Sequence, residues 1–281
     1  MSNIEENKIL VKKMQRVVFG ILCDIDEFCR ENNITYYLSG GTCLGAVRHK
    51  GFIPWDDDAD LMMPRKDYIR FIKLFQKKCS NKYSVGSLYT DDNWQRPFAR
   101  ICDRNSRVVP TRFTEQAMGI FVDIFPIDGL PEGKLKQKVY YQTIKVINAL
   151  RNSSVKQAFR ENEGYRLIKK TVAFVTRPIG PRWFAKKMDI IAKKYDFETS
   201  KQVAVSLAIH YWDKETIDRK YMCKPVYLEF EGKKLPVPVG YKKYLSNLYG
   251  NYMDIPKDAE QNGYTHLDGW VVEFDINDSK I

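Results

Sequence analysis

The sequence lacks the features that mark secreted, membrane-spanning or zinc-binding chains. Its six cysteines form no Cys-x-x-Cys pair and, with only three histidines, no zinc-like cluster. The acidic start MSNIEENK has no basic region leading into an apolar run, which a secretory signal requires. Lys and Arg interrupt every apolar run before about 18 residues, the length that a membrane-spanning helix needs. We therefore expect a cytoplasmic protein.

Apolar and charged residues are both abundant, but the positive charge is unevenly distributed. Hydrophobic residues occupy 44% of the 281 positions and aromatic residues 13%, which is ample for a buried core and argues against disorder. Residues 131–200 carry 16 Lys or Arg against 6 Asp or Glu, so most of the formal net charge of +11 lies in this middle region. Such a region suits an anionic membrane surface or nucleic acid.

Alternating helix and strand patterns predict a mixed α/β sheet domain over residues 1–130. Helices are expected at residues 4–32, 42–47 and 65–79, and strands at 34–38, 60–63, 83–89, 98–102 and 119–125. Residues 131–200 read as a basic helical region, with breaks near 152–154 and at Pro178 and Pro181. Residues 201–281 return to mixed structure, with a short helix over 241–249 that ends at Gly250.

The stretch GFIPWDDDADLMMPRKDY places four carboxylates, Asp56, Asp57, Asp58 and Asp60, within five positions. A solvated acidic turn accounts for Asp56 and Asp57. Asp58 and Asp60 are two residues apart, however, and so share one side of a strand as the chain turns apolar. A calcium-binding loop is excluded because Leu61 occupies its obligatory glycine position. Two carboxylates on one strand face suit a Mg²⁺ or Mn²⁺ ion that also binds phosphate.

The segments on both sides of this stretch favour the metal interpretation. Upstream, Gly40, Gly41 and Thr42 follow a strand and open a helix, where free backbone N–H groups are suited to phosphate. A Gly-Gly pair alone is more often only a turn. Downstream, Asp123 interrupts the apolar strand FVDIFPID, and a buried carboxylate there needs a partner, which a shared metal would supply.

The longer segment YYLSGGTCLGAVRHKGFIPWDDDADLMMPRKDY closely resembles the signature of the LicD family, the phosphocholine-type transferases of bacterial glycan synthesis that are related to fukutin and fukutin-related protein. FVDIFPIDGLP and LPVPVGYKKYLSNLYGNYMDIP agree with it, so the resemblance covers roughly residues 30–130 and 225–260. It implies a nucleotidyltransferase-like mixed sheet core with an inserted basic helical region at 131–200. Residues 201–281 would complete the catalytic unit.

The resemblance implies transfer of a phospho-alcohol, with CDP-choline as the expected donor, to a sugar hydroxyl of a lipid-linked or soluble glycan such as a teichoic acid precursor, releasing CMP. It gives roles by motif match. The metal-binding acids are Asp58, Asp60 and Asp123; the Arg-His step near the phosphates is Arg48 and His49; the phosphate-side turn is Gly40, Gly41 and Thr42.

Three further residues are candidates from their chemistry. Arg65 and Arg100 are suited to clamp phosphate oxygens, although Arg65 could simply open a surface helix. Trp55 could stack on the base, face a choline or only pack, and His49 could be an ordinary loop histidine.

Several alternatives stay open. Asp58 and Asp60 could be the Asp-x-Asp motif of a metal-dependent glycosyltransferase, although that leaves the Gly-Gly turn unexplained. The alcohol could be ethanolamine, ribitol or glycerol. A nucleic-acid-binding protein would use the basic region, but the acidic cluster would repel phosphate without a metal, so we expect no nucleic acid partner. The basic region could instead contact the anionic inner face of a membrane peripherally, face a lipid-diphosphate-linked acceptor, or be an ordinary solvated helical face. The oligomeric state stays open.

Overall fold

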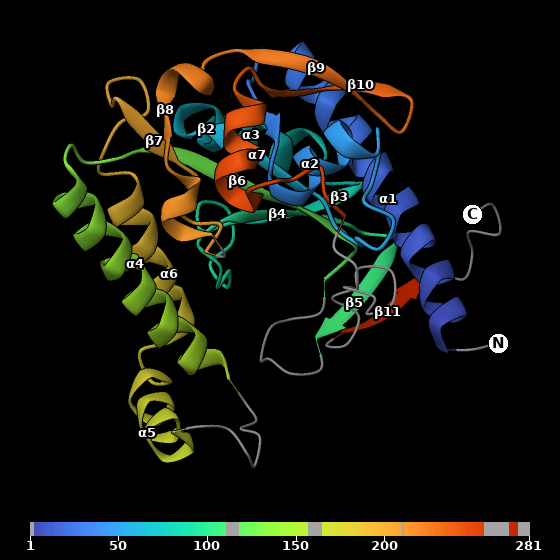
Figure 1. The fold of residues 1–281 in the computed structure, drawn as a ribbon. Helices are drawn as coiled ribbons and strands as arrows, with labels where there is room; N and C mark the ends of the chain where they lie inside the picture. The colour runs from blue at the N-terminus through green and yellow to red at the C-terminus, as the bar shows by residue number, and fades with distance from the viewer. Residues whose placement is uncertain (1–2, 111–117, 157–164, 210, 256–269, 275–281) are drawn as a thin grey trace.

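The computed structural model describes residues 3–110, 118–156, 165–209, 211–255 and 270–274, and its architecture is a mixed α/β fold (Figure 1). The α-helices are α1 (Asn3–Glu31), α2 (Gly40–Arg48), α3 (Arg65–Lys78), α4 (Lys134–Val155), α5 (Arg166–Thr176), α6 (Pro181–Ala192) and α7 (Tyr241–Tyr249). Two short 3-10 helices, η1 (Trp212–Glu215) and η2 (Arg219–Tyr221), lie between α6 and α7. The expected fold class, α/β with a mixed sheet core, is confirmed.

The central sheet has the order β1-β2-β6-β4-β3, and β7 and β8 extend it from the far end of β6. Only β2 and β6 run parallel among the described pairs of this sheet. Its strands are β1 (Tyr37–Leu38), β2 (Asp60–Pro64), β3 (Tyr83–Gly86), β4 (Ala99–Asp103), β6 (Phe121–Gly129), β7 (Gln202–Ala204) and β8 (Ile217–Asp218). Two separate antiparallel pairs are formed by β9 (Pro225–Phe230) with β10 (Lys233–Pro238), and by β5 (Ser106–Pro110) with β11 (Trp270–Phe274).

Helices α1 and α3 supply the main apolar core beside the sheet. The three- and four-residue spacing of Met14, Val18 and Ile21 puts these side chains on one face of α1, where all are buried. Phe28 of α1 packs edge-on against Phe71 and Phe75 of α3, so the two helices are held together as well as against the strands. Because α3 contacts both β2 and β6, and α1 contacts β6, this packing fixes the positions of the two strands.

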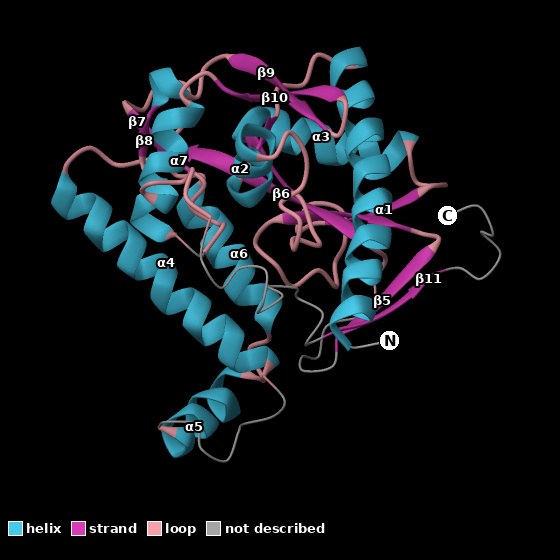
Figure 2. Ribbon diagram, turned by 45° about the vertical axis from the view of Figure 1, so that its right-hand side comes forward, coloured by secondary structure: helices cyan, strands magenta, loops and turns pink. Residues whose placement is uncertain are grey.

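Helices α4, α5 and α6 form a three-helix arm that projects from the sheet (Figures 1 and 2). Helix α4 packs against both α5 and α6. The arm and the end of β7 share a second apolar cluster that includes Tyr141, Ile144, Met188 and Ala204. None of the helices in the described part of the chain has the length and apolar character that crossing a membrane would require.

The chain after the arm returns to the sheet and to α2. Strand β7 pairs with Asp128 and Gly129 at the end of β6, and the Tyr37 hydroxyl donates a hydrogen bond to the Met222 carbonyl oxygen over 2.8 Å. Helix α7 packs against α2. Residues from both ends of the sequence thus surround α2; the division into 1–130, 131–200 and 201–281 stays a prediction.

Local differences from the sequence prediction have identifiable causes. The break expected near 152–154 lies one residue later, because α4 continues to Val155, with the Ser153 and Ser154 hydroxyls bonded to the Ala149 and Arg151 carbonyl oxygens of its last turns. The strand expected at 83–89 ends at Gly86. A Cβ atom there would lie 2.0 Å from the Trp94 ring, so the side chain of Trp94 occupies this space.

Candidate active site

A row of residues crosses the sheet on one face, through the N-terminal parts of β2 and β6. Asp60 is the register partner of Asp123, Asp123 of Arg100, and Arg100 of Gly86. Register partners on neighbouring strands point to the same face and lie about 5 Å apart. The Ser39 N–H donates to the Asp60 carbonyl oxygen over 2.9 Å and continues the row on the other side. The fold thereby brings together three sequence-predicted residues, Asp60, Asp123 and Arg100.

Asp123 and Arg100 bind each other within this row. The guanidinium donates from Nε to Asp123 Oδ1 over 2.5 Å and from Nη2 to Oδ2 over 2.8 Å, and both residues are buried. Arg100 also stacks on the Phe121 ring, 3.4 Å from its centroid, and lies 3.2 Å from Met118 Sδ. The sequence interpretation gave the buried Asp123 a shared metal as its partner, whereas the structure gives it a two-pronged charged hydrogen bond.

The acidic loop before β2 gathers a second group of carboxylates. Oxygen atoms of Asp56, Asp57 and Asp58 all lie within 4.8 Å of one another. Asp57 is only 2% exposed, so the expectation that it is a solvated turn residue is wrong. Gln15 of α1 holds the loop in place, because its Nε2 donates a hydrogen bond to the Asp56 carbonyl oxygen over 2.7 Å.

The expected metal set of Asp58, Asp60 and Asp123 is therefore divided between two places. Asp58 belongs to the loop group, whereas Asp60 and Asp123 are in the strand row and are not members of that close group in the described part of the chain. Clustered carboxylate oxygens are the ligands that Mg²⁺ and Mn²⁺ prefer. The loop group has the donor chemistry for such an ion, with Asp60 two residues further along the chain.

The N-terminus of α2 faces these carboxylates. Gly40 has a positive φ of 45°, a conformation in which a side chain would be strained. A Cβ atom on Gly41 would lie 3.0 Å from Asp56 Oδ2, and one on Gly40 would lie 3.6 Å from Asp60 Oδ2. The Asp60 N–H donates to Thr42 Oγ1 over 2.8 Å, so the first turn of α2 also fixes the start of β2. The sequence-predicted turn and the two acidic segments thus adjoin.

Aromatic and acidic residues of the C-terminal region lie directly behind this turn. The Tyr244 hydroxyl of α7 accepts a hydrogen bond from the Gly40 N–H over 3.3 Å and lies 3.2 Å from Ser39 Oγ. Tyr211 and Tyr249 meet edge-on with ring centroids 5.2 Å apart. Burial raises the pKa of Tyr211, and the negative charges of Glu215, Asp60 and Asp56 raise it further, which places this ring near the carboxylates.

The sequence analysis assigned no role to Tyr211, Glu215, Tyr244 or Tyr249, although it quoted the segment that contains the two later tyrosines. Tyr244 and Tyr249 lie in the quoted motif YKKYLSNLYG, but nothing in that motif shows that Tyr244 reaches Gly40. Glu215 is 2% exposed beside Tyr244, and burial raises its pKa to about 8 although hydrogen bonding to Tyr244 lowers it. No spacing or motif distinguishes it from the exposed Asp213.

Arg48 and His49 lie at the end of α2, away from its phosphate-facing turn. Arg48 donates from Nη1 to the carbonyl oxygens of Tyr252 and Asp254 over 3.1 and 3.0 Å, and so holds the chain that follows α7. Its Nε donates to His49 Nε2 over 2.9 Å. Burial and then the Arg48 charge lower the pKa of His49, which keeps the imidazole neutral. The His49 ring meets Trp55 edge-on, with centroids 6.3 Å apart.

Arg65 does not join the other candidates. It follows Pro64, at the end of β2 opposite to Asp60, and its guanidinium is bound to Asp128 and Asp189. Both carboxylates are buried, so these contacts occupy the charge of Arg65 inside the protein. The structure therefore gives no support to the sequence interpretation of Arg65 as a phosphate clamp.

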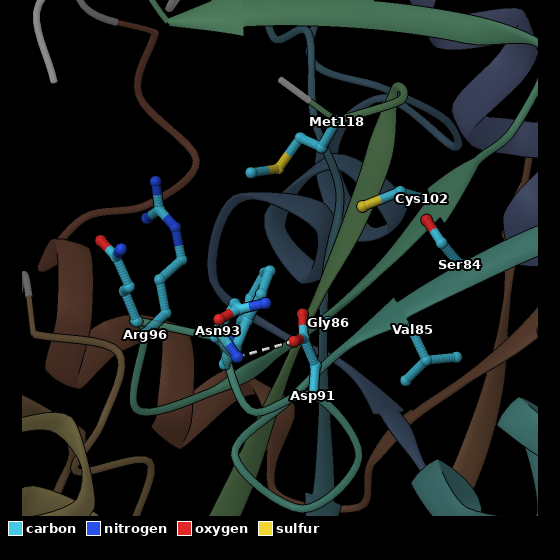
Figure 3. Close-up of a pocket in the computed structure, with 10 residues that line it drawn as sticks. Ser84, Val85, Gly86, Asp91, Asn93, Arg96, Cys102 and Met118 are labelled. Carbon is cyan, nitrogen blue, oxygen red and sulfur yellow. Dashed lines mark hydrogen bonds between the residues drawn. The ribbon is translucent and has the colours of Figure 1, made fainter. Parts of the chain in front are cut away.

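A hollow of about 230 Å³ opens on the Arg100 side of the row (Figure 3). Trp94, which covers Gly86, the register partner of Arg100, lines this hollow, and so does Met118, which contacts Arg100. Polar side chains from the loop after β3 line it: Asp91, Asn93, Gln95 and Arg96. The row of site residues thus connects the Gly-Gly turn at one end to a polar hollow at the other.

Comparison with known proteins identifies the class. Residues 33–146 match the family model described as "LicD/FKTN/FKRP, nucleotidyltransferase domain". This part of the chain is therefore similar to a LicD-type nucleotidyltransferase domain, which confirms the resemblance seen in the sequence. The matched range contains the Gly-Gly turn, the acidic loop and every residue of the strand row.

Individual relatives extend the similarity beyond that domain. The chain is 29% identical over 280 residues to the lipopolysaccharide cholinephosphotransferase LicD of Haemophilus influenzae, which covers 94% of this chain and 99% of that protein. It is 30% identical over 115 residues to an uncharacterized protein of Rickettsia prowazekii, covering 41% of this chain and 40% of the relative. The first similarity includes the three-helix arm and the region of α7.

Proposed function

We propose that this protein transfers a phospho-alcohol, phosphocholine in the first instance, from a CDP-linked donor to a sugar hydroxyl of a glycan precursor, releasing CMP. One observation carries this proposal: the helix N-terminus at Gly40 and Gly41 directly adjoins the carboxylates of Asp56 and Asp60. A helix N-terminus attracts a diphosphate, whereas carboxylates repel it unless a divalent cation lies between them. The near full-length similarity to a cholinephosphotransferase supports the choice of alcohol.

The residues fit a Mg²⁺ or Mn²⁺ ion. The oxygen atoms of Asp56, Asp57 and Asp58 lie within 4.8 Å of one another, and we infer that these residues, with Asp60, hold the ion. Such an ion neutralises diphosphate charge and stabilises a leaving phosphate group. Thr42 and Gln15 keep the two acidic segments in place through their hydrogen bonds to Asp60 and Asp56.

In the proposed reaction, the acceptor hydroxyl oxygen forms a new bond to the phosphorus that carries the alcohol. The bond from that phosphorus to the oxygen of CMP breaks, and CMP leaves with the electron pair. Asp123 is the proposed acceptor of the hydroxyl proton, because it is next to Asp60 in the row and Arg100 fixes its orientation. Trp55, Tyr211 and Tyr249 supply aromatic surface of the kind that binds a quaternary ammonium.

The polar hollow is the proposed binding place of the glycan acceptor, since it lies beyond Asp123 on the side away from the Gly-Gly turn. Arg96→Ala is expected to raise the KM for the acceptor about tenfold while changing the KM for the donor less than about twofold, because only one substrate loses a hydrogen-bonding partner. Steady-state kinetics with each substrate varied in turn measures both values. Equal increases in the two would contradict this assignment.

A donor screen tests the function as a whole. Purified protein is incubated with CDP-choline, CDP-ethanolamine, CDP-ribitol or CDP-glycerol, with Mg²⁺, with Mn²⁺ or with excess EDTA, and CMP release is measured. We expect metal-dependent CMP release, fastest from CDP-choline. Turnover of nucleotide sugars in place of every CDP-alcohol would instead identify a glycosyltransferase and overturn the proposal.

A further inference from the structure

Helix α5, at the tip of the three-helix arm, exposes its large apolar side chains and buries its small ones. Leu167 and Phe174 are 80% and 79% exposed, and Ile168 and Val175 are also exposed. The spacing of these four residues puts them on one continuous face of the helix. The face that packs toward α4 holds Ala173 and Thr176 instead. A helix in a soluble domain shows the reverse distribution.

The position of α5 leaves this face accessible. The helix lies at the end of the arm, on the side away from the sheet, in both ribbon views (Figures 1 and 2). At the start of α6, Trp183 is also half-exposed, and Lys187 lies 5.1 Å from the centroid of its ring. Aromatic rings with neighbouring lysines are typical of residues at the boundary between lipid and water.

The charge of the surrounding chain restricts what can cover this face. Residues 165–188 contain seven Lys or Arg and no Asp or Glu. A second copy of the chain docked through α5 would bring two basic surfaces together, which is unfavourable. An anionic lipid surface provides both an apolar interior for Leu167 and Phe174 and phosphate groups for the lysines. With 11 residues, α5 can lie in such a surface but is too short to cross it.

We propose that α5, together with Trp183 at the start of α6, docks the protein onto an anionic phospholipid surface. Leu167, Ile168, Phe174 and Val175 enter the lipid boundary, and basic residues such as Lys170 and Lys187 lie at the level of the phosphates. The proposal does not depend on catalysis, since lipid binding can be measured without turnover.

Vesicle co-sedimentation tests the proposal with the full chain. Vesicles of phosphatidylcholine with about 25% phosphatidylglycerol, at about 0.1 M salt, are compared with vesicles of pure phosphatidylcholine. Wild-type protein is expected to bind the anionic vesicles, and Leu167→Asp and Phe174→Asp are each expected to bind at least about tenfold more weakly. Ile9→Asp on α1 introduces the same charge at an exposed apolar residue outside the arm and is expected to bind as wild type.

The remaining outcomes separate lipid from other partners. Circular dichroism and thermal melts establish that each variant is folded; both α5 positions are exposed, so no loss of fold is expected. No association with anionic vesicles, or equal binding by Phe174→Asp and wild type, overturns the proposal. Equally tight binding to soluble polyglutamate, unaffected by Phe174→Asp, would identify an acidic protein partner and overturn it as well.

Discussion

At the scale of single residues, the carboxylates beside α2 place opposite demands on stability and activity. Like charges within 4.8 Å of one another repel, so Asp58→Asn is expected to leave the melting temperature unchanged or slightly higher. The same change removes a proposed metal ligand, and kcat/KM for CMP release is expected to fall at least about a hundredfold. Asp60→Asn is expected to behave in the same way.

The matched control is Glu27→Gln, which removes one exposed negative charge from α1. It is expected to retain wild-type activity. Thermal melts and CMP-release rates are measured for all variants with and without Mg²⁺. Wild-type rates from Asp60→Asn, or full activity in excess EDTA, would remove the metal from the proposed reaction.

Glu215 makes the stability of the protein depend on pH. Burial raises its pKa from 4.5 to about 8, and the titratable groups around it, Tyr211, Tyr244 and Tyr249, have pKa values raised by burial and so stay neutral in this range. Between pH 4.5 and about 8 the folded state therefore binds more protons than the unfolded state at this residue. The free energy of unfolding consequently falls as pH rises through this window. Below pH 4.5 the contribution of protonated Glu215 to that free energy is fully present.

Glu215→Gln removes the titration and is expected to remove this dependence. As pH rises across this range, the unfolding free energy of Glu215→Gln should increase relative to that of wild type by roughly 1 kcal/mol for each pH unit. Urea unfolding at several pH values between about 5 and 8 measures the difference. Parallel stability profiles for the two proteins would show that Glu215 titrates normally.

At the scale of elements, Arg65 joins α3 to β6 and α6. Its Nε donates to Asp128 Oδ1 over 2.7 Å and its Nη1 to Asp189 Oδ1 over 2.6 Å, and Tyr89 donates to the other Asp189 oxygen over 2.8 Å. Arg65→Met leaves two buried carboxylates without this guanidinium. We expect a loss of about 3–5 kcal/mol in unfolding free energy but a kcat/KM, corrected for the folded fraction, within about twofold of wild type.

The neighbouring Lys66 provides the control for Arg65. It is exposed and lies 3.5 Å from the exposed Asp196, so Lys66→Met is expected to change stability by less than about 1 kcal/mol. Denaturant unfolding and CMP release are measured on both variants. A stable Arg65→Met protein with little activity would restore the role of a phosphate clamp.

At the scale of the whole molecule, the proposed site is built from segments far apart in the sequence. Tyr244 reaches Ser39 and Gly40, Met222 accepts a hydrogen bond from Tyr37, and β7 pairs with the end of β6. A protein truncated after residue 200 would lose all of these contacts. It is expected to release no CMP. It is also expected to unfold without one sharp thermal transition, because apolar residues of α2 and the sheet would become exposed.

Adding residues 201–281 as a separate chain controls for that truncation. Activity that returns on mixing would show that the loss came from the missing contacts alone. Full activity of the shorter chain by itself would contradict the view that the C-terminal segment completes the catalytic unit.

The sequence by itself determined the features that depend on local spacing. The helix predicted over 65–79 is α3 (Arg65–Lys78), and the helix predicted over 241–249 is α7, which ends before Gly250 as expected. The acidic stretch and the Gly-Gly turn were recognisable because each has its chemistry within a few residues. Periodicity, turn residues and short motifs act over one or two turns of chain, so they can be read without a fold.

Only the tertiary structure decided which charges meet. Asp123 and Arg100 are paired because β4 and β6 are adjacent in register, and Arg65 is occupied because α6 brings Asp189 to it. Tyr244 reaches the Gly40 turn from a position 204 residues further along the chain, and the buried Glu215 lies beside Tyr244. Side-chain type shows that a charge needs a partner, but burial and strand register, which arise from long-range packing, determine whether that partner is an arginine, a tyrosine or a metal ion.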